Sequence, residues 1–559
     1  MALALPSMTI PKEVIEFRSK PFLCGAIGLW AEDAMRSVLR ASPSGLARLH
    51  SSEDAVVFVT DPGMVRQSSN SLSWELTGLR RTGANALSAS VTFDSGGASL
   101  STDSLGLTEV YYRQVGDAIF FASRIAPLLA IGGGELDTDW RAWADIIGLG
   151  YPVSDRTPFL QVRRMTAGMT WCFRRGSGPV QQIATPFWAA SERGPEVSPS
   201  DMASIVAAGI PRFFRRRPIV LLSGGWDSRM LAGLVCNRSI LRPEGWTTSP
   251  DDGWDEDIAF AGPVASSLRM KHHVEIPPED AFHRHATTTR RRVQYQTWMH
   301  TWLSPLARRL QAVGAPLFDG LAGDVLLKSL FISAETASIS NRTERMRSVW
   351  ASLSAGAGLG NDDVFTPELR SFVTETSWAN FGQVTDHIPD EPNDATLAVL
   401  LTRTMRGIGS SPLWVFGPEN DVRLPFLNPA VISAALTIPI ATKAGGTYYR
   451  QVLAEAAAHV ASLPSTNDGL PRAERGFRRQ SSTASLTWMA ELIASSDDAL
   501  DLLTDRMQKA VLEGSAELTR IGAHSSSLRM LQIASMFAEW QRDYEIFLND
   551  VGNAPWRRS

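Results

Sequence analysis

The sequence contains little cysteine. Cys24, Cys172 and Cys236 are the three cysteines among 559 residues, and they lie far apart without a Cys-x-x-Cys pair. This scarcity argues against a disulfide framework and a zinc site, and it fits a reducing compartment. An excess of one charge is also lacking, because 54 Lys and Arg residues against 58 Asp and Glu residues leave a net charge of −4. Such a balance gives no support for a nucleic-acid or membrane partner.

Long apolar runs are absent as well. The longest one, at about residues 430–440, is far too short to span a bilayer, and no basic segment precedes an apolar stretch at the start of the sequence. We therefore expect a soluble, cytoplasmic protein. With 44% hydrophobic and 20% charged residues, the chain has an ordinary globular composition and enough length for two or three domains.

The first part of the chain has the pattern of a β-rich domain. Short or alternating apolar runs, such as residues 55–60 and 118–122, are separated by Gly and Ser turns. They predict an antiparallel sheet domain over residues 1–187. Residues 188–197 form a predicted linker.

The second predicted domain, residues 198–559, has a different pattern. Strand-like segments at 218–222, 243–248 and 272–276 alternate with amphipathic helices, and helices dominate after about residue 335. This alternation predicts a doubly wound parallel sheet with extra helices. In such a fold the ligand lies beyond the carboxyl ends of the strands.

The most informative stretch is residues 219–228, Ile-Val-Leu-Leu-Ser-Gly-Gly-Trp-Asp-Ser. An apolar strand ends here in small, hydrogen-bonding residues at the start of a helix, where free backbone N–H groups and the helix dipole favour a phosphate. Asp227 would repel that phosphate unless a cation lies between them, so we interpret it as a Mg²⁺ ligand. The spacing differs from the common phosphate loop, and the stretch has no lysine. A glycine-rich turn without a chemical role is the alternative.

A second turn carries a further candidate ligand. The strand-like residues 315–318 run into Asp319-Gly320-Leu321-Ala322-Gly323-Asp324. This turn would lie at the same sheet edge as the first, so Asp324 is the expected second Mg²⁺ ligand, and a helix-capping Asp is the alternative. The residues predicted to bind the phosphate-bearing ligand are Leu222, Ser223, Gly224, Gly225, Asp227, Ser228, Thr247 and Gly320.

Four motifs in order resemble the asparagine-synthetase superfamily. They are the SGGxDS loop at 223–228, Asp255-Glu256 followed by Ala259 and Ala261, the turn at 320–324 with Ala322 in place of a second glycine, and Asp-Val-Arg-Leu-Pro-Phe-Leu-Asn at 421–428. The resemblance implies a degenerate Ntn-amidotransferase-like domain over 1–187. It also implies an ATP-pyrophosphatase synthetase domain over 198–559, which splits ATP between the α and β phosphates to form an acyl-adenylate.

Differences from the family's motifs restrict the reactions that the resemblance implies. A glutaminase of the family needs a cysteine directly after the initiator methionine, where this chain has Ala2, so we expect a substrate amine as the nucleophile. Leu321 stands where asparagine synthetases have an acidic residue and β-lactam synthetases a tyrosine. Asp421 replaces the motif's glutamate and is the predicted proton acceptor from the attacking ammonium. A salt bridge between Asp421 and Arg423 is its alternative role.

A basic residue of the family is also replaced. The resemblance implies a lysine that stabilises the tetrahedral intermediate and the departing pyrophosphate, but Glu474 occupies its position. Arg475 is the predicted catalytic replacement, with Arg472 and Lys443 as further candidates. Trp226 and Arg229 replace the small residues that the family usually has around Asp227. They are therefore the first positions at which to seek a property specific to this chain.

Together these features are most similar to the lasso-peptide cyclases, which are macrolactam synthetases. The resemblance implies that an Asp or Glu side chain of a precursor peptide is adenylated and then attacked by the peptide's N-terminal amine, with release of AMP and pyrophosphate. It further implies a cysteine-peptidase-like maturation partner and a leader-binding protein.

Several alternatives to this function remain. One is a small-molecule amide-forming or β-lactam-forming ligase, and another is an asparagine-synthetase-like enzyme that uses external ammonia. A tRNA-modifying ATP pyrophosphatase should show catalytic cysteines and a basic surface. A non-catalytic homologue should have lost Asp227 or Asp324, and the chain has both.

Overall fold

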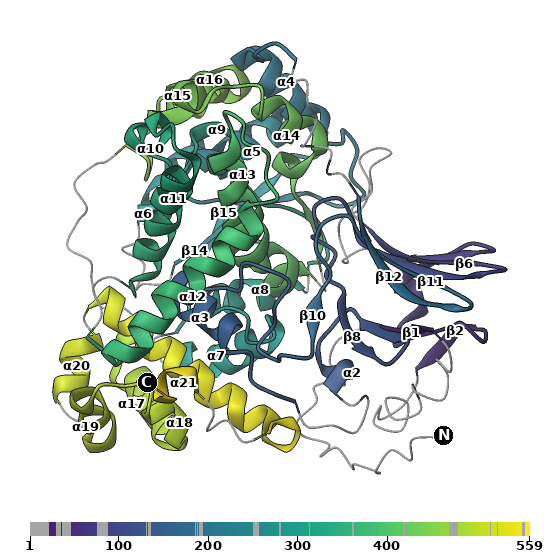
Figure 1. Cartoon of the computed structure of the whole chain (residues 1–559). Coiled ribbons are helices and arrows are strands. Elements are labelled where there is room, and N and C mark those ends of the chain that lie inside the picture. The colour runs from purple at the N-terminus through teal and green to yellow at the C-terminus, as the bar shows by residue number, and fades with distance from the viewer. Residues whose placement is uncertain are drawn as a thin grey trace.

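The protein has a mixed α/β fold in a computed structural model (Figure 1). The described residues are 22–28, 35, 46–74, 88–129, 131, 136–184, 186, 188, 194–249, 256–278, 281–311, 313–359, 363–417, 420–468, 479–514, 516–522, 524–549 and 554–558. Antiparallel sheets form the N-terminal part and a parallel sheet follows, as the sequence pattern predicts at this level.

Two antiparallel sheets of six strands each make up the N-terminal part. The first has the order β10-β8-β9-β1-β3-β2, with strands β1 (Leu23–Gly28), β2 (Ala47–Ser51), β3 (Ala55–Val59), β8 (Tyr111–Val115), β9 (Ala118–Ala122) and β10 (Arg163–Arg164). The second has the order β12-β11-β7-β6-β5-β4, with strands β4 (Val65–Gln67), β5 (Ser71–Trp74), β6 (Ala89–Asp94), β7 (Gly97–Ser101), β11 (Met169–Arg174) and β12 (Ser177–Ile183).

The first sheet is covered on both faces. Side chains that point to one face pack against the second sheet, and Phe121 stacks on Trp74 with ring centroids 6.2 Å apart. Their neighbours point to the other face and join a cluster with helices, in which the ring centroids of Trp143 and Trp540 lie 5.3 Å apart. Because successive side chains of a strand alternate between faces, this double burial explains why all five residues of β3 are apolar and buried.

The C-terminal sheet is parallel, with the order β15-β14-β13-β16-β17. Its strands are β13 (Ile219–Leu221), β14 (Glu244–Thr248), β15 (Lys271–Glu275), β16 (Pro316–Phe318) and β17 (Asp421–Arg423). The chain moves outward from β13 to β15 and then returns to place β16 on the other side of β13. The strand order therefore reverses between β13 and β16, and such a switch point is where open parallel sheets bind ligands.

Helices connect the parallel strands. They include α5 (Trp226–Arg238) after β13, α6 (Glu256–Ser267) after β14 and α9 (Gly323–Lys328) after β16. The other helices named in the described residues are α2 (Ala126–Leu129), α3 (Trp140–Leu149), α4 (Pro199–Ala208), α7 (Ala281–Arg292), α8 (Ser304–Gln311), α10 (Ala334–Ser338), α11 (Arg342–Ala357), α12 (Pro367–Thr385), α13 (Asp394–Val399), α14 (Pro429–Ala435), α15 (Ile440–Lys443), α16 (Thr447–Ala461), α17 (Thr483–Ala494), α18 (Asp497–Leu500), α19 (Asp505–Glu513), α20 (Ala516–Gly522) and α21 (Ser525–Tyr544).

The C-terminal helices reach back to the N-terminal part. Helix α3 packs against α12 and α21, and Figure 1 shows α17 to α20 gathered beside this group. The domain boundary between residues 187 and 198 stays a prediction. None of the helices in the described ranges has both the length and the apolar character needed to cross a bilayer.

Candidate functional site

The loop that follows β13 is organised by its own serines. The Ser223 N–H donates to Ser228 Oγ at 2.9 Å, and the Gly225 N–H donates to Ser223 Oγ at 3.2 Å. Gly225 is the N-cap of α5 and provides no side-chain cap, so the start of this helix is open to an external acceptor. The Gly224 N–H donates to Asp257 Oδ1 at 2.8 Å, so this backbone donor has an acceptor within the chain.

The second turn packs directly on the first. A Cβ atom on Gly323 would lie 2.7 Å from Asp227 Cγ, and one on Gly320 would lie 2.8 Å from Asp227 Cβ, so only glycine permits this approach. The Asp324 N–H donates to Asp227 Oδ2 at 3.0 Å. The Tyr449 hydroxyl of α16 donates to Asp227 Oδ1 at 2.5 Å. The structure thus brings together the two predicted Mg²⁺ ligands.

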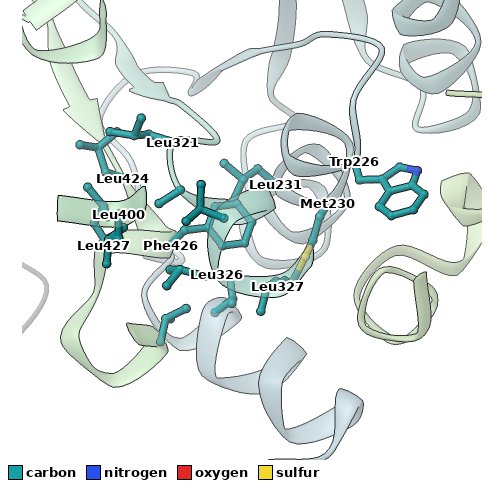
Figure 2. Close-up of a cluster of buried hydrophobic side chains, with 14 of the residues drawn as sticks. Trp226, Met230, Leu231, Leu321, Leu326, Leu327, Leu400, Leu424, Phe426 and Leu427 are labelled. Carbon is teal, nitrogen blue, oxygen red and sulfur yellow. The ribbon is translucent and has the colours of Figure 1, made fainter. Parts of the chain in front are cut away.

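An apolar layer beneath the two turns fixes their relative position. Met230 and Leu231 of α5 and Leu326 and Leu327 of α9 belong to one buried cluster with Phe426 (Figure 2). The two helices that begin at the turns therefore share a core, and their first residues are held side by side.

The carboxylates at this edge have raised pKa values. Burial raises the pKa of Asp227 well above its usual range, and the nearby Asp324 raises it further. Burial likewise raises the pKa of Asp324, which Arg403 and Lys328 partly oppose. Burial raises the pKa of Asp319, whose Oδ1 accepts a hydrogen bond from the Leu321 N–H, to about 6. Close carboxylates that resist ionisation in this way are stabilised by a cation.

The donor set fits Mg²⁺ with phosphate rather than a protein-only metal cage. In the described part of the chain no group of three or more His, Cys, Asp or Glu side chains could hold a metal. Mg²⁺ is usually bound through one or two carboxylates together with phosphate and water oxygens. Each oxygen of Asp227 accepts one hydrogen bond and keeps a further lone pair, so Asp227 and Asp324 suit this role.

A cavity of about 380 Å³ lies beyond the carboxyl ends of β13 and β16. Its lining includes the predicted residues Leu222, Ser223, Asp227, Ser228, Gly320 and Asp324. It also includes residues without a predicted role, which are Leu221, Trp246, Thr248, Asp257, His300, Trp302, Leu303, Leu306, Asp319, Leu321, Ala322, Arg403, Thr404, Ile408, Ser411, Pro412 and Phe416. The volume falls in the range of small-molecule sites, which is roughly 300 to 1,000 Å³.

One wall of the cavity is π-helical. Arg403, Thr404 and Ile408 come from the π-helix Leu400–Ile408, and the segment Ser411–Phe416 continues the wall. Such helices are rare and occur frequently at functional sites. Burial lowers the pKa of His300 to about 4, so this side chain is neutral near pH 7. Among the described residues of the lining, Arg403 is then the one cation, and four are aspartates.

Thr247 lies on the opposite side of its strand. Its neighbours Trp246 and Thr248 line the cavity, and alternation along β14 turns Thr247 away. The Thr247 hydroxyl donates to the Leu222 carbonyl oxygen at 2.7 Å and lies 2.8 Å from His272 Nε2. Thr247, which was predicted to bind the ligand, therefore supports the end of β13 and is not among the residues that line the cavity.

Asp421 also lies away from the cavity. It begins β17 and pairs with Pro316, whereas the cavity follows the other end of these strands. Its Oδ2 accepts a hydrogen bond from Arg423 Nη2 at 2.7 Å, so the salt bridge considered as the alternative is present. The structure does not bring this predicted proton acceptor to the other candidate residues, because the strand direction places it two residues before the carboxyl end.

Arg229 anchors the segment that covers the loop of residues 223–228. Its side chain is fully buried, and the guanidinium donates to the carbonyl oxygens of Val460, Leu463, Pro464 and Gly224. This side chain has a structural role that fixes residues 460–464 against the start of α5.

The covering segment continues toward the predicted basic loop. The Trp226 indole N–H donates to Ser465 Oγ at 2.9 Å, and the Thr466 N–H donates to the Gly224 carbonyl oxygen at 3.2 Å. Arg475, Arg472 and Glu474 lie outside the described residues, as do Ala2 and Asp255.

Lys443 forms its hydrogen bonds away from the cavity. Its buried ammonium donates to Asn393 Oδ1 at 2.7 Å and to the Ala435 carbonyl oxygen at 3.1 Å. It does not line the cavity.

Among the described site residues without a predicted role, Asp257, Asp319, Arg403 and Tyr449 bear on the charges and hydrogen bonds around the two turns. Asp319 directly precedes Gly320, and its polar side chain at a strand end was a usable signal. Asp257 follows the Asp255-Glu256 motif by one residue. Tyr449 and Arg403 lie in helical segments without a motif of their own, so only tertiary packing reveals them.

No protein-family model matches the sequence, and no curated protein matches it significantly. Any function inferred for the site therefore depends on the geometry of its residues.

Proposed function

We propose that the protein is an ATP-dependent, AMP-forming carbon–nitrogen ligase that activates a carboxylate as an acyl-adenylate. The observation that carries this proposal is the contact between the two turns at the switch point, where Asp227 accepts a hydrogen bond from the Asp324 N–H. A phosphate-binding helix start and a pair of carboxylates then face one cavity, which is the arrangement that Mg²⁺ and a nucleotide require.

The chain's own residues have distinct roles in this reaction. The hydroxyls of Ser223 and Ser228 and the open start of α5 bind phosphate oxygens. Asp227 and Asp324 would hold Mg²⁺, which neutralises charge on the departing pyrophosphate when it is bound. Leu303, Leu306 and other apolar lining residues exclude water, which would hydrolyse an acyl-adenylate.

For the substrate, we infer a precursor peptide that is closed into a macrolactam between its N-terminal amine and an Asp or Glu side chain. The resemblance to lasso-peptide cyclases supports this inference. The two packed antiparallel sheets are compatible with a degenerate Ntn-amidotransferase-like domain, next to an ATP-pyrophosphatase-like synthetase domain. Holding the two ends of a peptide together would remove on the order of 7 kcal/mol of entropic cost.

The buried position of Cys24 is consistent with a substrate amine as the nitrogen source. Cys24 lies buried in β1, and burial raises the pKa of its thiol to about 12. Such a thiol stays protonated and cannot act as a glutaminase nucleophile. With a cytoplasmic location, the proposal includes a cysteine-peptidase-like partner and a leader-binding protein that prepare the peptide.

The size of the cavity favours a second candidate function. A volume of about 380 Å³ accommodates a nucleotide with a compact acceptor more readily than a folded peptide. A ligase that forms an amide or a β-lactam on a small molecule, or that uses external ammonia, would share the same nucleotide site.

Pyrophosphate release with candidate peptides tests the proposal. The wild-type protein should form AMP and pyrophosphate and convert the peptide into a product lighter by one water. Asp227→Ala and Asp324→Ala should abolish release, and unchanged release in both variants would refute the site assignment. Asp421→Asn is the matched variant outside the cavity and should retain activity. A folded Asp421→Asn variant without activity would restore Asp421 as the proton acceptor.

A further inference from the structure

Lys328 ends α9, four residues after Asp324, and its ammonium group lies beside the phosphate loop. Its Nζ donates to Asn467 Oδ1 at 2.9 Å and lies 5.0 Å from the centroid of the Trp226 ring. The side chain is half-buried, and within the described ranges no carboxylate oxygen lies within 4.0 Å of the ammonium. The fold therefore holds a partly buried cation in one place without an anionic partner.

The two metal-binding carboxylates act on this cation from a distance. Burial lowers the pKa of Lys328, whereas Asp324 and Asp227 raise it. Lys328 thus lies within the electric field of both aspartates without forming an ion pair with either. An anion that contacts Lys328 on one side and a metal at the aspartates on the other would complete the balance of charge.

Asn467 extends this arrangement to the helix start. Because an ammonium can only donate, the Asn467 oxygen faces Lys328, and the amide NH₂ group remains a donor. A Cβ atom on Gly225 would lie 3.8 Å from this nitrogen and 3.9 Å from Thr466 Oγ1. Two side-chain donors therefore stand next to the N-cap residue of α5.

The neighbouring cation Arg450 has a different role. Its guanidinium also lies over the Trp226 ring, 5.2 Å from the centroid, but it donates to Asp468 Oδ1 at 3.1 Å. The Asp468 carboxylate already balances this charge. Trp226 thus positions two cations, of which Lys328 is the one without a carboxylate partner in the described residues.

We propose that Lys328, with Asn467 as a second donor, binds the pyrophosphate that leaves ATP. This inference rests on the proposed function and names the cation that serves its leaving group. A carboxylate oxygen of the substrate forms a bond to Pα, and the bond between Pα and the oxygen bridging to the β-phosphate breaks. The electron pair leaves on pyrophosphate, to which Lys328 and Asn467 donate hydrogen bonds without transferring a proton.

Calorimetric titration with magnesium pyrophosphate tests this role without a peptide substrate. The wild-type protein should bind one equivalent, and Lys328→Met should weaken binding roughly ten- to a hundredfold, as expected for the loss of a charge-assisted hydrogen bond. Lys328→Arg should retain most of the affinity. Lys271→Met, at an exposed position of β15, is the matched control and should bind like the wild type.

The outcomes separate the inference from the proposed function. If the wild type binds pyrophosphate and a folded Lys328→Met variant binds it equally tightly, the role of Lys328 is wrong and the proposed function stands. If the wild type binds no pyrophosphate, the proposed function itself is contradicted. Asn467→Ala supplies a second variant should Lys328→Met fail to fold, and unchanged affinity in it would also overturn the assignment. Thermal unfolding without ligand, unchanged between variants, distinguishes lost binding from lost structure.

Discussion

Replacement of Asp319 by Asn should stabilise the protein in a manner that depends on pH. Burial raises the pKa of Asp319 from 3.8 to about 6, so the folded protein binds this proton more tightly than the unfolded chain does. Between pH ~4 and pH ~6 the folded state carries more protons, and its free energy of unfolding therefore falls as the pH rises. The full penalty applies above this window and is absent below it.

The destabilisation by ionised Asp319 follows in size from the same pKa difference. At 1.36 kcal/mol per pKa unit, the loss of unfolding free energy is at most about 3 kcal/mol at neutral pH. After allowance for solvent screening of a partly exposed group, it is about 1 to 2 kcal/mol. Asn has no charge and can still accept the hydrogen bond from the Leu321 N–H, which spans 2.8 Å. We therefore expect Asp319→Asn to unfold at a higher urea concentration than the wild type at pH 7.5, with the difference vanishing near pH 4.

The assay is urea unfolding in the presence of EDTA at both pH values. Asp117→Asn, at an exposed position in the turn between β8 and β9, is the control and should show no such gain. An Asp319→Asn variant that is less stable than the wild type at pH 7.5, or equally stabilised at both pH values, would show that burial of the ionised Asp319 does not destabilise the fold.

Three further substitutions test other parts of the site. Arg229→Met removes the buried donor to several carbonyl oxygens and should lower the free energy of unfolding by about 2 to 5 kcal/mol; wild-type stability in urea would contradict its anchoring role. Ala322→Gly should raise stability by about 1 kcal/mol, because Ala322 has a φ of 79°, and a lower urea midpoint would count against strain at this position. Asp227→Asn should abolish magnesium-dependent pyrophosphate release and raise the melting temperature in EDTA, since it removes a carboxylate that Asp324 repels. Retained release would contradict its role as a Mg²⁺ ligand.

The sequence was sufficient to predict the features that depend on apolar periodicity and on the residues at strand ends. Short or alternating apolar runs predicted the antiparallel part, and the alternation of strands with amphipathic helices predicted the parallel part. Small polar residues after two strands located the loops of Ser223 and Asp324. Since the carboxyl ends of parallel strands meet at one edge, the contact between Asp227 and Asp324 followed from the same pattern.

Side-chain direction and packing between distant segments could not be obtained in this way. Thr247 occupies a predicted strand and Asp421 a strand that was not predicted, and the phase and register of each strand decide whether its side chain reaches the cavity. Tyr449 approaches Asp227 from a helix 222 residues away in sequence. Arg403 faces the cavity from a π-helix that no apolar periodicity indicated.

An experimental structure with Mg²⁺ and the α,β-methylene analogue of ATP, which cannot be cleaved between the α and β phosphates, would show whether this cavity is an ATP site. We expect the triphosphate to lie on the loop of residues 223–228, with Mg²⁺ on Asp227 and Asp324 and the β-phosphate within reach of Lys328. A nucleotide bound elsewhere, or no nucleotide in this cavity at saturating concentration, would contradict the proposal that ATP binds where the strand order reverses between β13 and β16.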